Sequence, residues 1–151
     1  MQQAVAGAAV GEFSLSSASR GKLERVHPDL IAVVASAIEI TDIDFSVIDG
    51  VRTERKQAEL IKLGASWTMN SRHLPRVIQG YEELGAVGCA VDLAAWIDGV
   101  RWEAGLYQHI YRAMQSSALS LDIAIDWGGW WARQDLGHFE LSWREYVPVS
   151  G

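Results

Sequence analysis

The chain has 151 residues, enough for one domain that buries a hydrophobic core without disulfides or a partner. Acidic residues outnumber basic ones, 19 to 13, and the net charge of −6 disfavours nucleic-acid binding, because a phosphate backbone would be repelled. The single cysteine, Cys89, excludes an internal disulfide and a zinc site built from several thiolates.

The N-terminal stretch predicts little regular structure. Residues 1–10 are mildly apolar, but no Lys or Arg precedes the apolar run, so we expect neither a signal peptide nor a membrane span there. Residues 11–21 are rich in Ser and Gly, which is typical of an irregular segment. We therefore expect a lead-in over residues 1–22 and a single domain over residues 23–151. We also expect a monomer with no membrane partner and no nucleic-acid partner.

Three helices are expected along the chain. The first places Pro28 in its opening turn, where the missing N–H of proline is not needed. The second begins after Thr53, a good N-cap residue, and ends before Gly64. The third carries apolar side chains at helical spacing. These predicted helices cover residues 27–40, 53–63 and 103–119.

Five strands are expected between and after these helices. Asp98 and Gly99 form a two-residue hairpin turn, so the strands on either side of it pair antiparallel. Short connections and the absence of a strand–helix–strand rhythm favour an α+β domain, with a small antiparallel sheet packed on helices. The predicted strands cover residues 44–49, 89–97, 100–102, 123–125 and 139–143.

The strand over residues 89–97 combines an apolar face with one carboxylate. Side chains alternate along a strand, so Asp92 points away from the core face, beside the small residues Ala90 and Ala94. Small neighbours leave space for a ligand next to the carboxylate. The core face is expected to carry Val91, Leu93, Ala95 and Ile97.

The last strand repeats this pattern with an imidazole. Phe139 and Leu141 face one way, and His138 and Glu140 face the other. His73, in the irregular stretch, can be added from a loop. Two imidazoles and one carboxylate form a three-ligand zinc set that leaves a position open for water, as catalytic sites do.

Several short motifs in this order resemble the D-alanyl-D-alanine carboxypeptidase and L-alanyl-D-glutamate endopeptidase family, and above all its phage endolysin branch. The resemblance extends roughly from residue 23 to residue 141, and the combination in this order is far more specific than any one motif alone. The motifs are Ser71-x-His73, Gly88-x-Ala90-x-Asp92 and Asp135-x-x-His138, supported by Gly50-Val51-Arg52-Thr53 with Gln57, by Asn70-Ser71-Arg72-His73-Leu74 and by Asp126-Trp127-Gly128-Gly129.

The resemblance implies roles for individual residues and a zinc site on one face of a small sheet. The Zn²⁺ ligands would be His73, Asp92 and His138. Asp135 would be the general base, and Arg52 would hold the substrate carbonyl and share its developing negative charge. Ser71, Gln57 and Trp127 are further candidates, either as supporting partners of the site or as substrate contacts.

The spacing between the first two ligands departs from the family. The family usually places six residues there, whereas residues 74–91 separate His73 from Asp92. Residues 75–85, bounded by Pro75 and Gly85, are interpreted as an insertion. We expect it to loop out beside the metal as a lid or specificity surface, because both flanking motifs are intact.

Each assignment has a plainer alternative. His73 could be a surface loop histidine, Asp92 a solvated strand residue and His138 a half-buried histidine. Asp135 could be an ordinary turn residue, and Arg52 could form a surface ion pair of little energetic value. The occurrence of all the motifs together favours the site. Glu140 is a lesser candidate for the base, and core packing is the simpler role for Trp127 and Cys89.

The sequence thus predicts a zinc metallopeptidase that cuts the L-alanyl-D-glutamate bond of peptidoglycan peptide stems during host lysis. Such a protein would stay in the host cytoplasm until lysis and then act in the periplasm and cell wall. One alternative is a D-Ala-D-Ala carboxypeptidase with the same zinc site. Another is a non-catalytic zinc domain that binds the wall, although the presence of Asp135 counts against it.

Overall fold

A computed structural model describes residues 11–150 and confirms an α+β fold with a small antiparallel sheet. The helices are α2 (Ser17–Lys22), α3 (Pro28–Ile40), α4 (Glu54–Lys62) and α5 (Ala104–Leu121), with short 3-10 helices η1 (Glu82–Leu84) and η2 (Gly128–Trp130). The strands are β1 (Asp44–Asp49), β2 (Ala90–Trp96), β3 (Val100–Arg101), β4 (Ile125–Trp127) and β5 (His138–Leu141). None of the helices described is long and apolar enough to cross a bilayer.

The order of the strands places the polar residues of different strands side by side. The sheet runs β1-β2-β5-β4, every pair is antiparallel, and β3 extends β2 as a hairpin. Asp92 of β2 lies opposite His138 of β5, and Asp126 of β4 lies opposite Glu140. Directly opposite residues point to the same face of a sheet. The carboxylate and the imidazole predicted from alternation are therefore neighbours.

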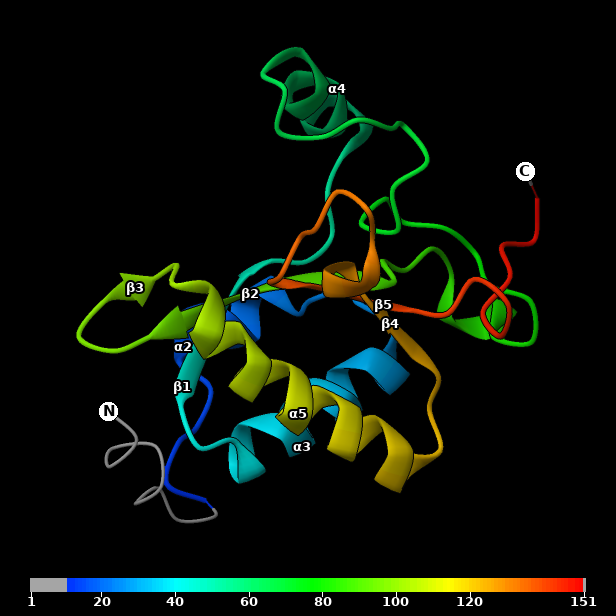
Figure 1. Ribbon diagram of the computed structural model, residues 1–151. Helices are drawn as coiled ribbons and strands as arrows, with labels where there is room; N and C mark the ends of the chain where they lie inside the picture. The colour runs from blue at the N-terminus through cyan, green and yellow to red at the C-terminus, as the bar shows by residue number, and fades with distance from the viewer. Residues whose placement is uncertain (1–10, 151) are drawn as a thin grey trace.

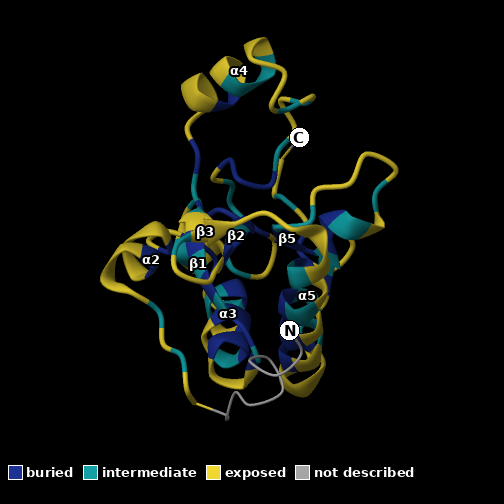
Figure 2. Ribbon diagram, turned by 60° about the vertical axis from the view of Figure 1, so that its left-hand side comes forward, coloured by how far each residue is buried: buried dark blue, intermediate teal, exposed yellow. Residues whose placement is uncertain are grey.

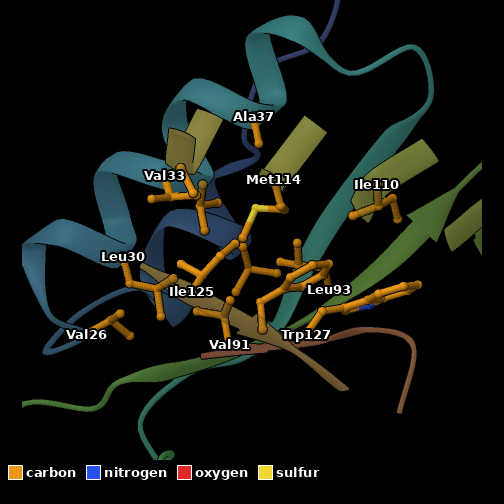
Figure 3. Close-up of a cluster of buried hydrophobic side chains, with 14 of the residues drawn as sticks. Val26, Leu30, Val33, Ala37, Val91, Leu93, Ile110, Met114, Ile125 and Trp127 are labelled. Atoms are coloured by element: carbon orange, nitrogen blue, oxygen red, sulfur yellow. The ribbon is translucent and has the colours of Figure 1, made fainter. Parts of the chain in front are cut away.

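The core fills the space between the other face of the sheet and two helices. Figure 1 shows α3 and α5 side by side beneath the strands, and Figure 2 shows their buried sides turned toward the sheet. Side chains of the sheet meet those of the helices in one apolar cluster (Figure 3), which includes Leu30, Val33, Val91, Leu93, Ile110, Met114, Ile125 and Trp127. Because the helices cover this face alone, the opposite face is left for a site.

Some of the predicted boundaries differ from the structure. The lead-in is not wholly irregular, because α2 forms within it, capped by Ser16, and the buried hydroxyl of Ser19 accepts a hydrogen bond from Val47 N at 2.9 Å. Residues 1–10 of that lead-in lie outside the described residues. The strand expected over residues 123–125 begins at Ile125 instead. Ile97, expected in the core, is 38% exposed, because β2 ends one residue earlier.

The segment interpreted as an insertion packs against the body of the protein. Ile78 is fully buried, and the chain around it pairs with two other segments through Arg76 and Val87 and through Ile78 and Pro148. The hydroxyl of Tyr81 donates a hydrogen bond to the carboxylate of Asp29 at 3.2 Å. The expectation of a self-contained surface excursion is therefore wrong. The proline and glycines of this segment suggested a surface loop, but Ile78 anchors it in the core.

Candidate active site

Three side chains predicted as metal ligands converge on one point above β2 and β5. One candidate ligand atom from each of His73, Asp92 and His138 lies within 4.8 Å of the others. Nε2 of His73 is 3.2 Å from Asp92 Oδ1, and Nδ1 of His138 is 3.0 Å from the same oxygen. The loop histidine and the two strand residues are thus brought together as the sequence predicted.

Hydrogen bonds on the far sides of the rings fix how the two imidazoles face the cluster. Nδ1 of His73 lies 2.7 Å from the carbonyl oxygen of Gly50, which can only accept, so this nitrogen carries the proton and Nε2 is free to bind a metal. Nε2 of His138 lies 2.7 Å from Oε1 of Glu140, which leaves Nδ1 for the cluster. Such outer partners orient metal-binding histidines.

Glu140, considered as a lesser candidate for the base, contacts the ring of a predicted ligand. The side chain is buried and holds the His138 ring, so it is not free to serve as the base. The sequence did contain a signal for this contact. Glu140 follows the predicted ligand His138 by two residues, so both side chains lie on the same face of the strand.

Charges around the cluster decide its protonation. Burial disfavours a charged His138, but the hydrogen bonds that its ring donates to Asp92 and Glu140 outweigh burial and raise its pKa to about 9. Burial likewise disfavours ionisation of Asp92, yet the two histidines hold its pKa well below the usual range. A cation bound at this point would take over the charge that the His138 proton supplies here.

Arg52 lies beside the cluster and is extensively hydrogen-bonded. Its guanidinium donates to Asp49, to Gln57 Oε1 at 2.7 Å and to Asp92 Oδ2 at 3.4 Å. Its backbone N–H also donates to the carbonyl of His73 at 2.8 Å. The structure thus connects Arg52 to two of the predicted ligands. Asp49, which accepts from two nitrogens of the Arg52 guanidinium, was not singled out in the sequence.

Asp135 lies in a loop that returns from η2 to β5. Its backbone N–H donates to the carbonyl of Gly128 at 3.0 Å, and a side chain at Gly128 would meet the Asp135 carbonyl oxygen at 2.2 Å. A glycine is therefore required for the loop to close. Although the residue as a whole is exposed, desolvation of its carboxyl and the nearby charge of Asp92 raise the pKa of Asp135.

The cluster lies in a cleft with a volume of about 1200 Å³. Its floor is the polar face of the sheet. One wall is the loop after α4, and the other is the loop over residues 131–135, which Figure 1 shows rising toward α4. No residue from 75 to 85 is among those that line the cleft. The expectation that this segment borders the metal as a lid is therefore also wrong.

The three supporting candidates occupy different places. Ser71 lines the cleft, and its hydroxyl accepts a hydrogen bond from His73 N at 3.1 Å, which shapes the ligand loop. Gln57 is fully buried, does not line the cleft and holds Arg52. Trp127 is a core residue that stacks on Tyr111, and its indole N–H donates to the carbonyl of Leu136 at 2.7 Å. Of these three residues, Ser71 alone lines the cleft.

Comparisons with known proteins agree with this geometry. A family model described as phage L-alanyl-D-glutamate peptidase matches residues 11–144. The L-alanyl-D-glutamate peptidase of Escherichia phage T5 is 25% identical over 134 residues, which cover 85% of this chain and 89% of that protein. The crystal structure of the Serratia marcescens L-Ala D-Glu endopeptidase ChiX is similar to this fold with a TM-score of 0.75 and 35% identity, and the match covers 89% of this chain and 94% of that one.

The family match spans nearly the whole described chain and includes every predicted site residue. The fold, the converging His, Asp and His side chains and the sequence matches all lead to one assignment. The chain belongs to the phage L-alanyl-D-glutamate peptidase family.

Proposed function

We propose that the protein is a zinc-dependent endopeptidase that hydrolyses the L-alanyl-D-glutamate bond of peptidoglycan stems and acts as an endolysin at host lysis. The observation that carries this proposal is the geometry of His73, Asp92 and His138, which present two oriented imidazole nitrogens and a carboxylate on the floor of an open cleft. This donor set suits Zn²⁺ in a catalytic site, where three protein ligands leave a position for water.

The residues of the chain would divide the chemistry among them. Zinc, when bound, supplies a Lewis acid and lowers the pKa of a water molecule toward ~7. Asp135 lines the cleft and carries a raised pKa, so its carboxylate would accept the proton of the attacking water and pass it to the leaving amine. Water attacks the scissile carbonyl carbon, the C–N bond breaks, and no covalent intermediate with the protein forms.

Arg52 would contribute positive charge near the scissile carbonyl. It lines the cleft next to Asp92, and its guanidinium is held in place by Asp49 and Gln57. A preorganised cation in a water-poor site stabilises a developing oxyanion without rearrangement. In the same position Arg52 holds Asp92 toward the metal.

The decisive experiment is mass spectrometry of the products from purified peptidoglycan, with and without Zn²⁺ in chelator-treated protein. We expect about one zinc per chain, loss of activity in chelator and recovery with Zn²⁺, and products that begin with D-Glu. Release of D-Ala alone would identify a carboxypeptidase instead. Binding of peptidoglycan without any cleavage by zinc-loaded protein would identify a non-catalytic wall-binding domain.

The role in lysis requires a separate test in cells. Expression in the cytoplasm of a Gram-negative host should leave the cells intact until the inner membrane is permeabilised, because the wall lies outside that membrane. We expect rapid loss of turbidity on permeabilisation with the native protein and none with an inactive variant. Equal turbidity loss for both would contradict the role in lysis.

A further inference from the structure

The two walls of the cleft are joined above the candidate metal site by a small set of contacts. Nη2 of Arg133 donates a hydrogen bond to the carbonyl oxygen of Gly64 at 3.1 Å, although the two residues are 69 positions apart. The guanidinium carbon of Arg133 also lies 4.6 Å from the centroid of the Trp67 ring. Gly64 and Trp67 follow α4, whereas Arg133 belongs to the loop that carries Asp135.

Aromatic contacts continue this connection down to a predicted ligand. The rings of Trp67 and Trp131 meet edge to face with centroids 6.0 Å apart. The ring of Trp131 in turn lies 4.9 Å from the imidazole of His138. A continuous series of contacts therefore runs from His138 through both tryptophans to Arg133 and the end of α4. We call residues 64–67 and 131–133, with these contacts, the arch.

The other end of α4 is attached to the same site from the opposite direction. Gln57 of α4 accepts a hydrogen bond from Arg52, which contacts Asp92, and its amide donates to Ser66 Oγ at 2.7 Å and Thr68 O at 2.6 Å. Figures 1 and 2 show α4 standing away from the sheet, with chain leading to it on both sides. The sheet, α4 and the loop over residues 131–135 are thus linked by a ring of contacts around the candidate metal site, although the cleft remains open at its ends.

A closed ring restricts which peptides reach the metal site. A stem with one free end can pass beneath the arch end first. A stem that is attached to glycan at one end and cross-linked at the other has no free end, so it can reach the floor only if the arch opens. The contacts at Arg133 are the place where opening costs least, because a hydrogen bond and a cation–π contact at the surface are both weak.

We propose that Arg133 is a specificity-determining residue, and that the arch it closes makes the enzyme cleave stems with a free end in preference to cross-linked stems. This inference rests on the proposed function for the identity of the substrate. It assigns Arg133 no contact with the reacting atoms. Its effect is to set how often the cleft admits a substrate that is tethered at both ends.

The test compares two substrates and three proteins. The substrates are a soluble disaccharide-peptide monomer and the cross-linked peptidoglycan from which such monomers are made. For Arg133→Ala we expect kcat/KM on cross-linked material to rise about fivefold relative to the monomer, the size expected from removing two weak contacts. The change should appear in KM, since the metal site is untouched. Arg112→Ala, which removes the same charge from the exposed surface of α5, should leave the ratio unchanged.

The variant Arg133→Lys distinguishes closure of the arch by Arg133 from direct binding of substrate charge by Arg133. Lysine keeps the positive charge in the cleft but loses the planar group that lies over Trp67 and donates to Gly64. The proposal expects Arg133→Lys to behave like Arg133→Ala. If lysine instead preserves native behaviour, and alanine weakens both substrates equally, Arg133 binds substrate charge directly and the arch is rejected. The arch is also rejected if both variants leave unchanged the ratio of kcat/KM on cross-linked peptidoglycan to kcat/KM on the monomer.

A covalent cross-link tests the proposal in the opposite direction, by holding the arch closed. Ala65→Cys with Arg133→Cys, joined by a short bis-maleimide, should abolish cleavage of cross-linked peptidoglycan while the monomer is still hydrolysed. The native Cys89 does not interfere, because it is buried and burial raises its pKa to about 11. Undiminished cleavage of cross-linked material by the joined protein would overturn the proposal. If the native protein cleaves neither substrate, the proposed function itself fails, which is a distinct result.

Discussion

The floor of the cleft and the arch above it are held in very different ways. The floor consists of strand residues and one buried loop histidine, and each imidazole makes a second hydrogen bond on its far side, to the carbonyl of Gly50 or the carboxylate of Glu140. The arch depends on Arg133 and a pair of tryptophans, of which Trp67 is half exposed. We therefore expect the rigidly held floor to carry out the proposed chemistry. We expect the weakly held arch to open when a polymeric substrate enters the cleft.

This difference predicts where substitutions act. Changes in the floor should reduce kcat or metal affinity for every substrate, because all substrates use the same ligands. Changes in the arch should alter the ratio between substrates. Changes in the packing that supports the floor should lower the free energy of unfolding without changing kcat, metal affinity or the ratio between substrates.

The largest effect is expected at the proposed base. Asp135→Asn should lower kcat about 10²–10⁴-fold, because the proton relay is lost while the shape of the loop is kept. Zinc content, measured by elemental analysis, should stay at the native level. Asp98→Asn, in the exposed hairpin turn, is the matched control and should be fully active. Loss of zinc in Asp135→Asn would make Asp135 a ligand and would contradict the assigned role.

The next effect concerns the segment between the first two ligands. Ile78→Ala should lower the free energy of unfolding by about 2–5 kcal/mol, because a fully buried side chain is replaced by a cavity. KM for the monomer should be unchanged, since the segment does not line the cleft. Denaturant unfolding measures the loss, with the exposed Gln79→Ala as control. A normal stability with altered KM would restore the lid interpretation.

This segment also shows what the sequence could and could not predict. Alternation in β2 and β5 sufficed to place Asp92 and His138 on one face, because period two is a property of every strand. Resemblance added His73. The burial of Ile78 was not predictable, since the short apolar pair Val77-Ile78 lies between Pro75 and Gly80 and has no periodicity to reveal its partners.

The arch and the outer partners were missed for a related reason. Arg133 and Gly64 are 69 positions apart, and no local pattern connects them. Asp49 and Glu140 are strand residues near predicted ligands, but strand alternation gives only the face of a side chain and not its hydrogen-bond partner. Long-range hydrogen bonds of single side chains are a product of the tertiary fold, whereas each predicted metal ligand lies in a short local motif.

A smaller effect tests the partner behind His138. Glu140→Gln keeps an oxygen near Nε2 but removes the charge, so zinc affinity or activity should fall about 10–100-fold. Competition with a chromophoric chelator measures the affinity directly. Glu145→Gln, an exposed residue beyond β5, serves as the control. An unchanged affinity would show that the ring is held by packing against Trp131 alone.

The smallest expected effect is a pH dependence at His27, remote from the cleft. His27 is fully buried at the start of α3, where Nδ1 accepts a hydrogen bond from Asp29 N at 3.0 Å and Nε2 has no hydrogen-bond partner within residues 11–150. Burial lowers the pKa of His27 and the charge of Arg72 lowers it further, whereas Asp29 and Glu83 act in the opposite direction. The net direction is below the ordinary value of 6.5.

The sign of the pH effect follows from this lowered pKa. As pH falls below about 6.5, the unfolded chain takes up a proton at His27 before the folded protein does, so the free energy of unfolding falls. Above that pH both states are neutral and the contribution is constant. His27→Asn keeps an acceptor for the N–H of Asp29 but cannot titrate. The melting temperature of the native protein should therefore fall more than that of His27→Asn between about pH 7.5 and about pH 5.5, with zinc saturating in both. Equal shifts in the two proteins would show that His27 is solvated or already charged, and that the contacts of its ring with Tyr81 and Tyr146 do not exclude water.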